Sequence, residues 1–241
     1  MKQCIIIIII ISGLIPYFGF AQTENNIPKT NDYINSYASD EVKFNETIKN
    51  VGYKDFQGSP YLTDSFTVGS IYTYKNEQFQ NIPIRYNIYT DNIEYIMGAS
   101  RVLELKNPES VEKVELQNCK LVYLQASGIK NQAQGFFIVL TEGKATLLSK
   151  PRVTLQKPTP QGAYNDSQPP GFLRHTDTYY LKTADNICLL SNRKKLIQSF
   201  PEHRKQVADY IKANHVKVTD SKNLTELVKY YNSLQDNTDI P

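Results

Sequence analysis

Residue types that carry out chemistry are few and scattered in this 241-residue chain. The sequence has no G-x-S-x-G, H-E-x-x-H, P-loop or G-x-G-x-x-G pattern, and so no motif of a serine hydrolase, a zinc protease or a nucleotide-binding protein. Its three histidines and three cysteines include no C-x-x-C pair. We therefore expect no catalytic set that a motif identifies, no metal site and no cofactor.

Glycoside hydrolysis needs no local motif, because its two carboxylates are defined by their separation in space. The candidates are three acids on predicted strands, Glu94, Glu104 and Glu115. Acids on half-exposed strands are ordinarily solvated, so the sequence favours a non-enzymatic function. A hydrolase that acts on envelope glycans or peptides is kept as an alternative.

A polar contact surface is predicted on one strand. Period-2 alternation places Ile82, Ile84, Tyr86 and Ile88 on one face, and Arg85, Asn87 and Tyr89 on the other. We expect Tyr86 to be buried with its hydroxyl paired, and Arg85 to lie on the wetter face. There Arg85 either joins Asn87 and Tyr89 in binding a ligand or partner, or forms an ion pair with an acid such as Glu94.

Two further contact candidates, Arg174 and His175, lie in a segment rich in Pro and Gly. This segment, residues 156–176, is predicted to be a long connection that carries the chain over the edge of the sheet. Polar residues on such loops often contact ligands, although an exposed loop histidine needs no function.

Cys119 and Cys188 remain once a signal peptide is removed, and each lies in a predicted strand. In an oxidising compartment the two either form a disulfide or stay as buried thiols. Sequence spacing leaves both readings open.

The first 21 residues indicate the cellular location of the protein. Lys2 precedes an apolar run with seven consecutive isoleucines, and Gly19 and Ala21 supply small residues before Gln22. This layout is typical of a secretory signal peptide (residues 1–21) cut after Ala21, with a retained membrane anchor as the alternative. We expect an exported protein of the periplasm or cell surface, with no transmembrane segment after cleavage. A formal net charge of only +3 gives no reason to expect a nucleic-acid partner.

The remaining chain is divided by its hydrophobic patterns. Residues 22–49 are a polar leader and a short cover segment, and residues 50–190 alternate as short strands separated by turn residues. The predicted fold is α+β and mainly β: an antiparallel meander, either a sandwich or a half-open barrel, followed by C-terminal helices in residues 191–241. Helix spacing is clearest after Asn223, which with Glu226 resembles a capping box. Its apolar stripe includes Leu227 and Tyr231, which we expect to pack on the β domain.

Three stretches together resemble a family. They are Gly58-Ser59-Pro60-Tyr61-Leu62 with Phe66 and Gly69, then Ile84-Arg85-Tyr86-Asn87-Ile88-Tyr89, and a tail that runs from Tyr179-Tyr180-Leu181 through Arg193-Lys194-Lys195-Leu196 to Leu227-Val228-Lys229-Tyr230-Tyr231-Asn232. This order is similar to a family of uncharacterised exported proteins of Gram-negative bacteria, which implies an envelope or secreted location and no activity.

The leading functional hypothesis is a cell-envelope module that binds an envelope partner or ligand through its tyrosine-rich sheet and has no enzymatic activity. Besides the hydrolase, a carrier of an apolar ligand in a half-open barrel is an alternative.

Overall fold

The computed structural model describes residues 56–98, 101–125, 134–156, 169–184 and 186–236. The predicted signal peptide (1–21) and the predicted leader and cover segment (22–49) lie outside the described residues.

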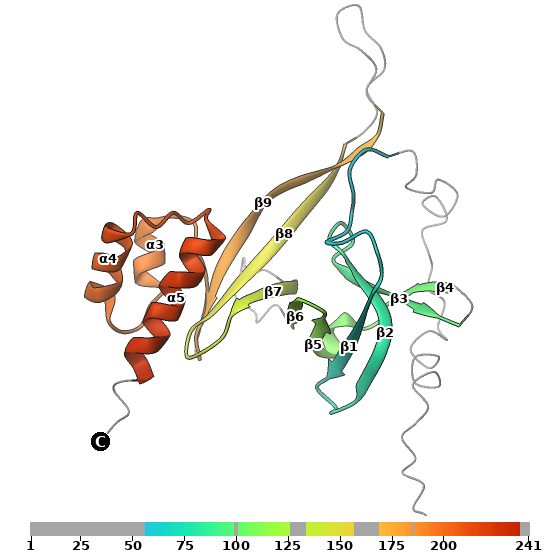
Figure 1. Ribbon diagram of the computed structural model, residues 1–241, viewed down its shortest axis with the longest axis horizontal. Helices are drawn as coiled ribbons and strands as arrows, with labels where there is room; N and C mark the ends of the chain where they lie inside the picture. The colour runs from blue at the N-terminus through green and yellow to red at the C-terminus, as the bar shows by residue number, and fades with distance from the viewer. Residues whose placement is uncertain (1–55, 99–100, 126–133, 157–168, 185, 237–241) are drawn as a thin grey trace, which may run out of the picture.

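Ten antiparallel strands form one open sheet, and three helices follow it (Figure 1). The predicted class, an antiparallel β fold with C-terminal helices, is confirmed. The strands are β1 (Thr67–Thr73), β2 (Gln78–Asn87), β3 (Asn92–Met97), β4 (Arg101–Glu104), β5 (Val111–Leu116), β6 (Cys119–Leu124), β7 (Gly135–Thr141), β8 (Thr146–Gln156), β9 (Gly171–Lys182) and β10 (Ile187–Leu189), with the short 3-10 helix η2 (Pro108–Ser110) before β5.

The sheet is built outward from its first strand. Its order is β10-β9-β8-β7-β6-β5-β1-β2-β3-β4, so β2 to β4 extend from one side of β1 and β5 to β10 from the other. Short turns join most neighbours and force them to be antiparallel. Asn76 and Asp91 occupy positive-φ positions in two of these turns, a conformation that Asn and Asp tolerate better than most residues.

The first apolar core lies on the inner face of the curled sheet. It is filled from β1 to β7 by side chains such as Ile84, Ile93, Val114, Leu121 and Phe136, all with no exposed surface. Tyr86 belongs to this core and is 1% exposed, as its place in the alternation predicted.

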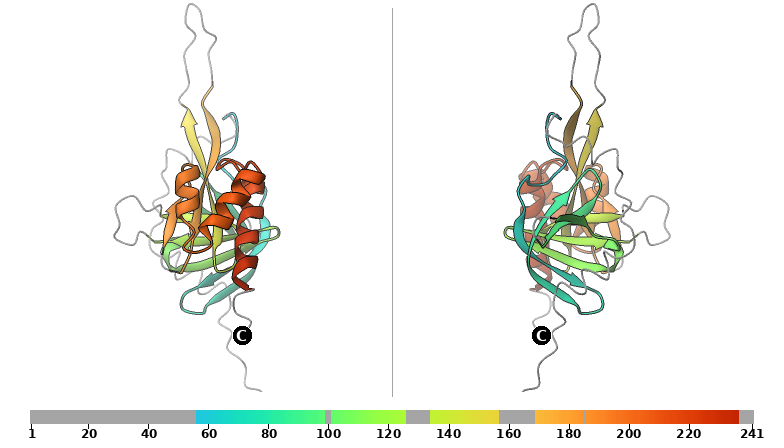
Figure 2. Two further views of the ribbon diagram at one scale, coloured as in Figure 1. Left: turned by 90° about the vertical axis from the view of Figure 1, so that its left-hand side faces the viewer. Right: turned by 90° about the vertical axis from the view of Figure 1, so that its right-hand side faces the viewer.

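The second core lies between the sheet and the helices α3 (Arg193–Gln198), α4 (Arg204–Ala213) and α5 (Ser221–Asp236). Leu147 and Leu181 come from the sheet, while Leu227 and Tyr231 come from α5. Both predicted α5 contacts are confirmed, since Leu227 is fully buried and Tyr231 nearly so. The left panel of Figure 2 shows the three helices together at this end of the molecule, and they are called the cap below.

Two local predictions were wrong. The segment 156–176 was predicted to be a connection, but β9 already begins at Gly171, and its polar residues Arg174 and His175 are strand residues. Each face of this part of β9 combines one apolar with one polar residue, Phe172 with Arg174 and Leu173 with His175, so no alternation marked the strand. Asn223 does not cap α5 either: Asp220 accepts a hydrogen bond from the Asn223 backbone N–H at 3.1 Å, and the helix starts at Ser221.

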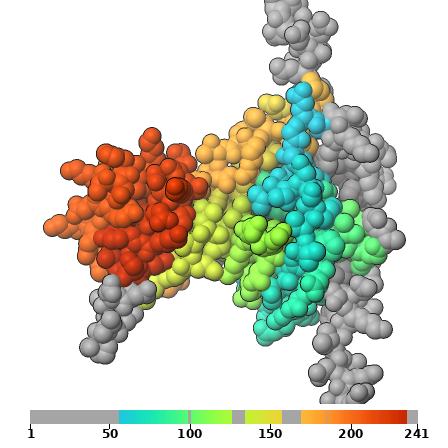
Figure 3. Space-filling view, viewed as in Figure 1, coloured from blue at the N-terminus to red at the C-terminus, as the bar shows by residue number. Residues whose placement is uncertain are grey.

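One segment of the chain projects from the sheet, and another crosses it. The distal half of the β8–β9 hairpin, residues 152–156 and 171–176, is called the arm and extends beyond the body (Figure 1). Residues 57–66 are called the strap, which passes from the arm to the end of β2 (Figure 3). It pairs with β9 through Gln57 and Gly171, and with β2 through Tyr61 and Asn87. None of the described helices is long and apolar enough to cross a membrane.

Candidate functional site

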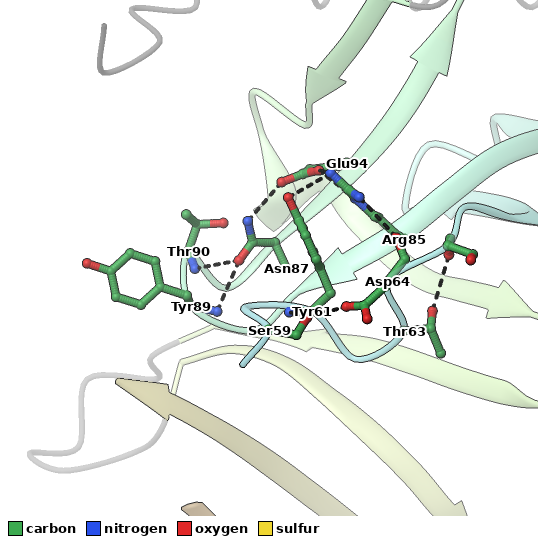
Figure 4. A network of polar contacts seen from close by, with 10 residues as sticks. Ser59, Tyr61, Thr63, Asp64, Arg85, Asn87, Tyr89, Thr90 and Glu94 are labelled. Atoms are coloured by element: carbon green, nitrogen blue, oxygen red, sulfur yellow. Dashed lines mark hydrogen bonds and ion pairs between the residues drawn. The ribbon is translucent and has the colours of Figure 1, made fainter. Parts of the chain in front are cut away.

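An ion pair between neighbouring strands forms the centre of the first candidate site (Figure 4). Arg85 on β2 lies directly opposite Glu94 on β3. The Arg85 Nη2 atom is 2.6 Å from Glu94 Oε2, and Nε donates to the same oxygen at 2.8 Å. The sequence allowed Arg85 either to bind a partner or to pair with Glu94, and the structure pairs it.

The strap occupies the remaining donors of Arg85. Its Nη1 donates to the backbone carbonyl of Asp64 at 3.1 Å, and its Nη2 donates to the Tyr61 hydroxyl at 2.7 Å. The guanidinium carbon also lies 3.6 Å from the ring centroid of Tyr61 and 4.3 Å from that of Phe66. Stacked and hydrogen-bonded contacts of this kind suit the planar guanidinium of arginine.

Asn87 connects this ion pair to the β2–β3 turn. Its amide donates to Glu94 Oε1 at 2.8 Å, while its side-chain oxygen accepts from the backbone N–H groups of Tyr89 and Thr90, each at 3.1 Å. Asn87 is fully buried. Of the three predicted contact residues on this strand, only Tyr89 is exposed.

The three candidate acids do not gather at one place. Glu104 on β4 lies opposite Glu94, and burial, with the neighbouring Glu94 charge, raises the pKa of its carboxyl. Glu115 lies on β5, and two strands, β1 and β2, separate it from β3 in the sheet. A hydrogen bond from Lys113 lowers the pKa of Glu115. Both oxygens of Glu94 accept hydrogen bonds within the protein, so Glu94 is held as a structural partner of Arg85 and Asn87.

A second polar cluster, missed by the sequence reasoning, connects the β2–β3 turn to β7 and β8. Asp91 Oδ2 is 2.8 Å from Lys150 Nζ, and its Oδ1 accepts from the Tyr86 hydroxyl at 2.7 Å. Lys150 also donates to the carbonyl of Phe136 at 2.9 Å. Burial lowers the pKa of Lys150 and raises that of Tyr86. The available signal was a lone lysine inside the apolar run Leu147-Leu148-Ser149-Lys150-Pro151.

Gly135 makes this cluster geometrically feasible. Its φ is +108°, and a Cβ built there would lie 1.7 Å from Asp91 Oδ2 and 2.7 Å from Lys150 Nζ. Only a residue without a side chain leaves room for the ion pair. The ion pair therefore joins the β2–β3 turn to β8 beside Tyr86 and Phe136 of the first core.

An apolar surface lies along one face of the arm, beside the β2–β3 turn. Among the described residues six large apolar side chains are exposed, and two belong here: Tyr89 (37%) and Leu155 (41%). A third, Leu173 (43%), alternates to the opposite face of the hairpin, where it pairs with Thr154. The Tyr89 ring lies 5.3 Å from that of Phe172, which pairs across the hairpin with Leu155. We call Tyr89, Leu155, Phe172 and Arg174 the arm patch.

The two predicted loop residues lie on opposite faces of the arm. Arg174 alternates to the same face as Phe172 and forms an ion pair with Asp177 at 2.6 Å. His175 points to the other face, where its Nε2 is 2.7 Å from Thr154 Oγ1. The structure thus brings Arg174 and Tyr89 to one region and separates His175 from them.

The disulfide allowed by the sequence is not formed, because Cys119 and Cys188 are both free thiols. Cys119 lies on β6 and Cys188 on β10, and three strands separate them. Cys188 lines a pocket of about 420 Å³ between the β9–β10 hairpin and the cap. Burial raises the pKa of the Cys119 thiol, which favours its neutral form. Among the described residues, no group of three or more His, Cys, Asp or Glu could hold a metal ion.

Comparisons with protein-family models, curated proteins and solved structures found no match for this chain.

Proposed function

We propose that this protein is an exported module of the bacterial cell envelope, without enzymatic activity, that binds a partner protein through the arm patch. The observation that carries the proposal is the pair of exposed apolar side chains Tyr89 and Leu155, both of which neighbour Phe172 on one face of the projecting arm. Exposed apolar side chains scattered singly need no explanation, but a cluster next to an arginine has the composition of contact surfaces.

The architecture beneath the patch supports this proposal. Phe172 is buried and stacks on Phe56 at 5.5 Å, and it supports the exposed ring of Tyr89, whose backbone is fixed by Asn87. Rigid aromatic anchors lose little conformational entropy when a partner binds them. The Arg85 cluster then has a positioning role, because it fixes the strap and the β2–β3 turn that carry the patch.

The two alternatives have less support. A hydrolase needs two carboxylates with access to a substrate, whereas Glu94 is buried and both of its oxygens accept internal hydrogen bonds. A carrier needs an apolar cavity, whereas the inner face of the sheet is packed with fully buried side chains.

Site-specific photo-cross-linking tests the binding surface. A photoreactive residue is placed at position 174, in the patch, or at position 74, a control site in the turn after β1 where Tyr74 is 59% exposed. We expect a discrete cross-linked protein adduct from position 174 and none from position 74. The double change Leu155→Ser and Tyr89→Ser should abolish the adduct, while Val68→Ser should not. The proposal fails if both positions yield the same adducts.

Export is tested separately by intact-mass measurement on protein from the periplasmic or secreted fraction. The mass should correspond to residues 22–241, with or without cyclisation of Gln22. Protein found only in the cytoplasm or the membrane with residues 1–21 retained would contradict the export part of the proposal.

A further inference from the structure

The net charge of the protein is concentrated in the cap. Residues 191–236 contain nine Lys and Arg and five Asp and Glu, a net charge of +4. The remaining 195 residues contain 18 basic and 19 acidic residues and so carry a net charge of −1. The end of the molecule formed by the helices is thus basic, while the rest of the chain is nearly neutral.

The basic side chains of the cap all lie on its outside. Each of the nine is exposed: Arg193, Lys194, Lys195, Arg204, Lys205, Lys212, Lys217, Lys222 and Lys229. Two of the acids have partners within the cap, because Glu226 pairs with Lys229 on its surface and Asp220 accepts hydrogen bonds from Asn223 at the start of α5. The charge that the cap presents to a partner is therefore predominantly positive.

The placement of these charges is unfavourable for the helices themselves. None of α3, α4 and α5 has an acidic residue in its first turn, and α3 and α4 both begin with basic residues. The positive end of the helix dipole disfavours cations at this position. A sequence that breaks a local stability rule on two successive helices is expected to do so for function.

We infer that the cap binds the anionic phospholipid headgroups of a membrane surface. Seven of the nine basic residues are lysines; six lie on the three helices, and Lys217 lies between α4 and α5. Flexible, strongly hydrated lysines suit diffuse attraction to a fluid layer of headgroups, whereas bidentate recognition of one phosphate favours arginine. The arm extends in a different direction from the cap (Figure 1), so a protein held by its helices keeps the arm patch accessible.

Co-sedimentation with vesicles tests this inference on protein purified after export. The readout is the difference in binding between vesicles with 30 mol% phosphatidylglycerol in phosphatidylcholine and vesicles of phosphatidylcholine alone. We expect binding only to the anionic vesicles at low salt, and its loss as salt is raised. The triple change Lys194→Gln, Lys205→Gln and Lys212→Gln should weaken the apparent affinity at least tenfold.

A matched control removes the same charge from the sheet. Lys75, Arg101 and Arg152 are exposed strand or turn residues, and their replacement by Gln should change the affinity by less than twofold. Equal loss in both triple variants, or binding to phosphatidylcholine alone, would overturn the inference. It would also fail if the protein bound heparin but no vesicle, which would assign the surface to a soluble polyanion. None of these outcomes affects the cross-linking test of the arm patch.

Discussion

The two apolar cores of this protein are enclosed in different ways. The core between sheet and cap is enclosed by apolar contacts, in which Leu196, Phe200, Val207, Leu224 and Leu227 have no exposed surface. The core inside the curled sheet is bordered by polar links between separate segments, the Asp91–Lys150 pair and the pairing of the strap with β9 and β2. One face of the sheet is thus covered by helices, while specific hydrogen bonds and an ion pair join segments around the other core.

The largest effect is expected from a cavity in the cap. Leu227→Ala should destabilise the protein by about 2–5 kcal/mol, because a fully buried leucine is truncated. Lys229→Ala, on the exposed side of the same helix, should cost no more than about 0.5 kcal/mol. Chemical denaturation measures both. Equal midpoints would show that α5 does not dock as described.

A smaller effect is expected from removing a charge beside the inner core. Glu94→Ala leaves Arg85 and Asn87 without their shared acceptor and should cost about 3 kcal/mol. The loss of stability should be smaller than for a fully buried unpaired charge, because the Arg85 side chain is 16% exposed. Adding Arg85→Met should recover part of the stability in a double-mutant cycle. A double variant as unstable as the sum of the two single changes would contradict the coupling.

Removal of the Asp91–Lys150 ion pair should have a local effect on stability. Lys150→Met keeps the apolar stem but removes the cation, and should cost about 1 kcal/mol. Hydrogen exchange should accelerate at Phe136, whose backbone N–H donates to Asp91 at 3.2 Å, and should be unchanged in α5. If hydrogen exchange accelerated uniformly throughout the chain, the Asp91–Lys150 pair would not stabilise this region separately from the rest of the fold.

The smallest effect depends on pH. The pKa of Glu104 is raised in the folded protein by burial and by Glu94, so its ionisation opposes folding. The stability that the protonated carboxyl contributes is fully present below the pKa of an unfolded glutamate and is lost as pH rises through the folded pKa. Glu104→Gln should therefore raise the melting temperature at pH 7 and leave it unchanged at pH 3.5. A rise of the same size at both pH values would exclude this cause.

Sequence reasoning succeeded where local periodicity decides the outcome. The alternation around Tyr86 predicted its burial, and helical spacing predicted the burial of Leu227 and Tyr231. Alternation also placed Arg85 and Asn87 on the outer face, but it could not show that a strap would cover them. Periodicity shows which face of a strand packs on an apolar layer. It does not show whether another segment of the chain covers the opposite face.

The remaining features depend on contacts that no local pattern encodes. Lys150 and Asp91 are 59 positions apart, and Gly135 belongs to a third segment. The arm patch combines Tyr89 from the β2–β3 turn with residues of β9, a strand that the Pro- and Gly-rich composition of its neighbours concealed. These contacts depend on the pairing of β5 with β1. The predicted meander, in which consecutive strands are neighbours, did not include this pairing.

The pairing of β5 with β1 has a consequence for how the chain folds. Strands β1 to β4 can pair as soon as they leave the ribosome, because each lies next to its neighbour in sequence. The other edge of β1 then stays unpaired until the chain from Thr73 to Val111 has been made and β5 can bind it. Every later strand adds to a neighbour that is already present. The edge of β1 is therefore the surface through which a partly synthesised or partly exported chain would associate with another copy.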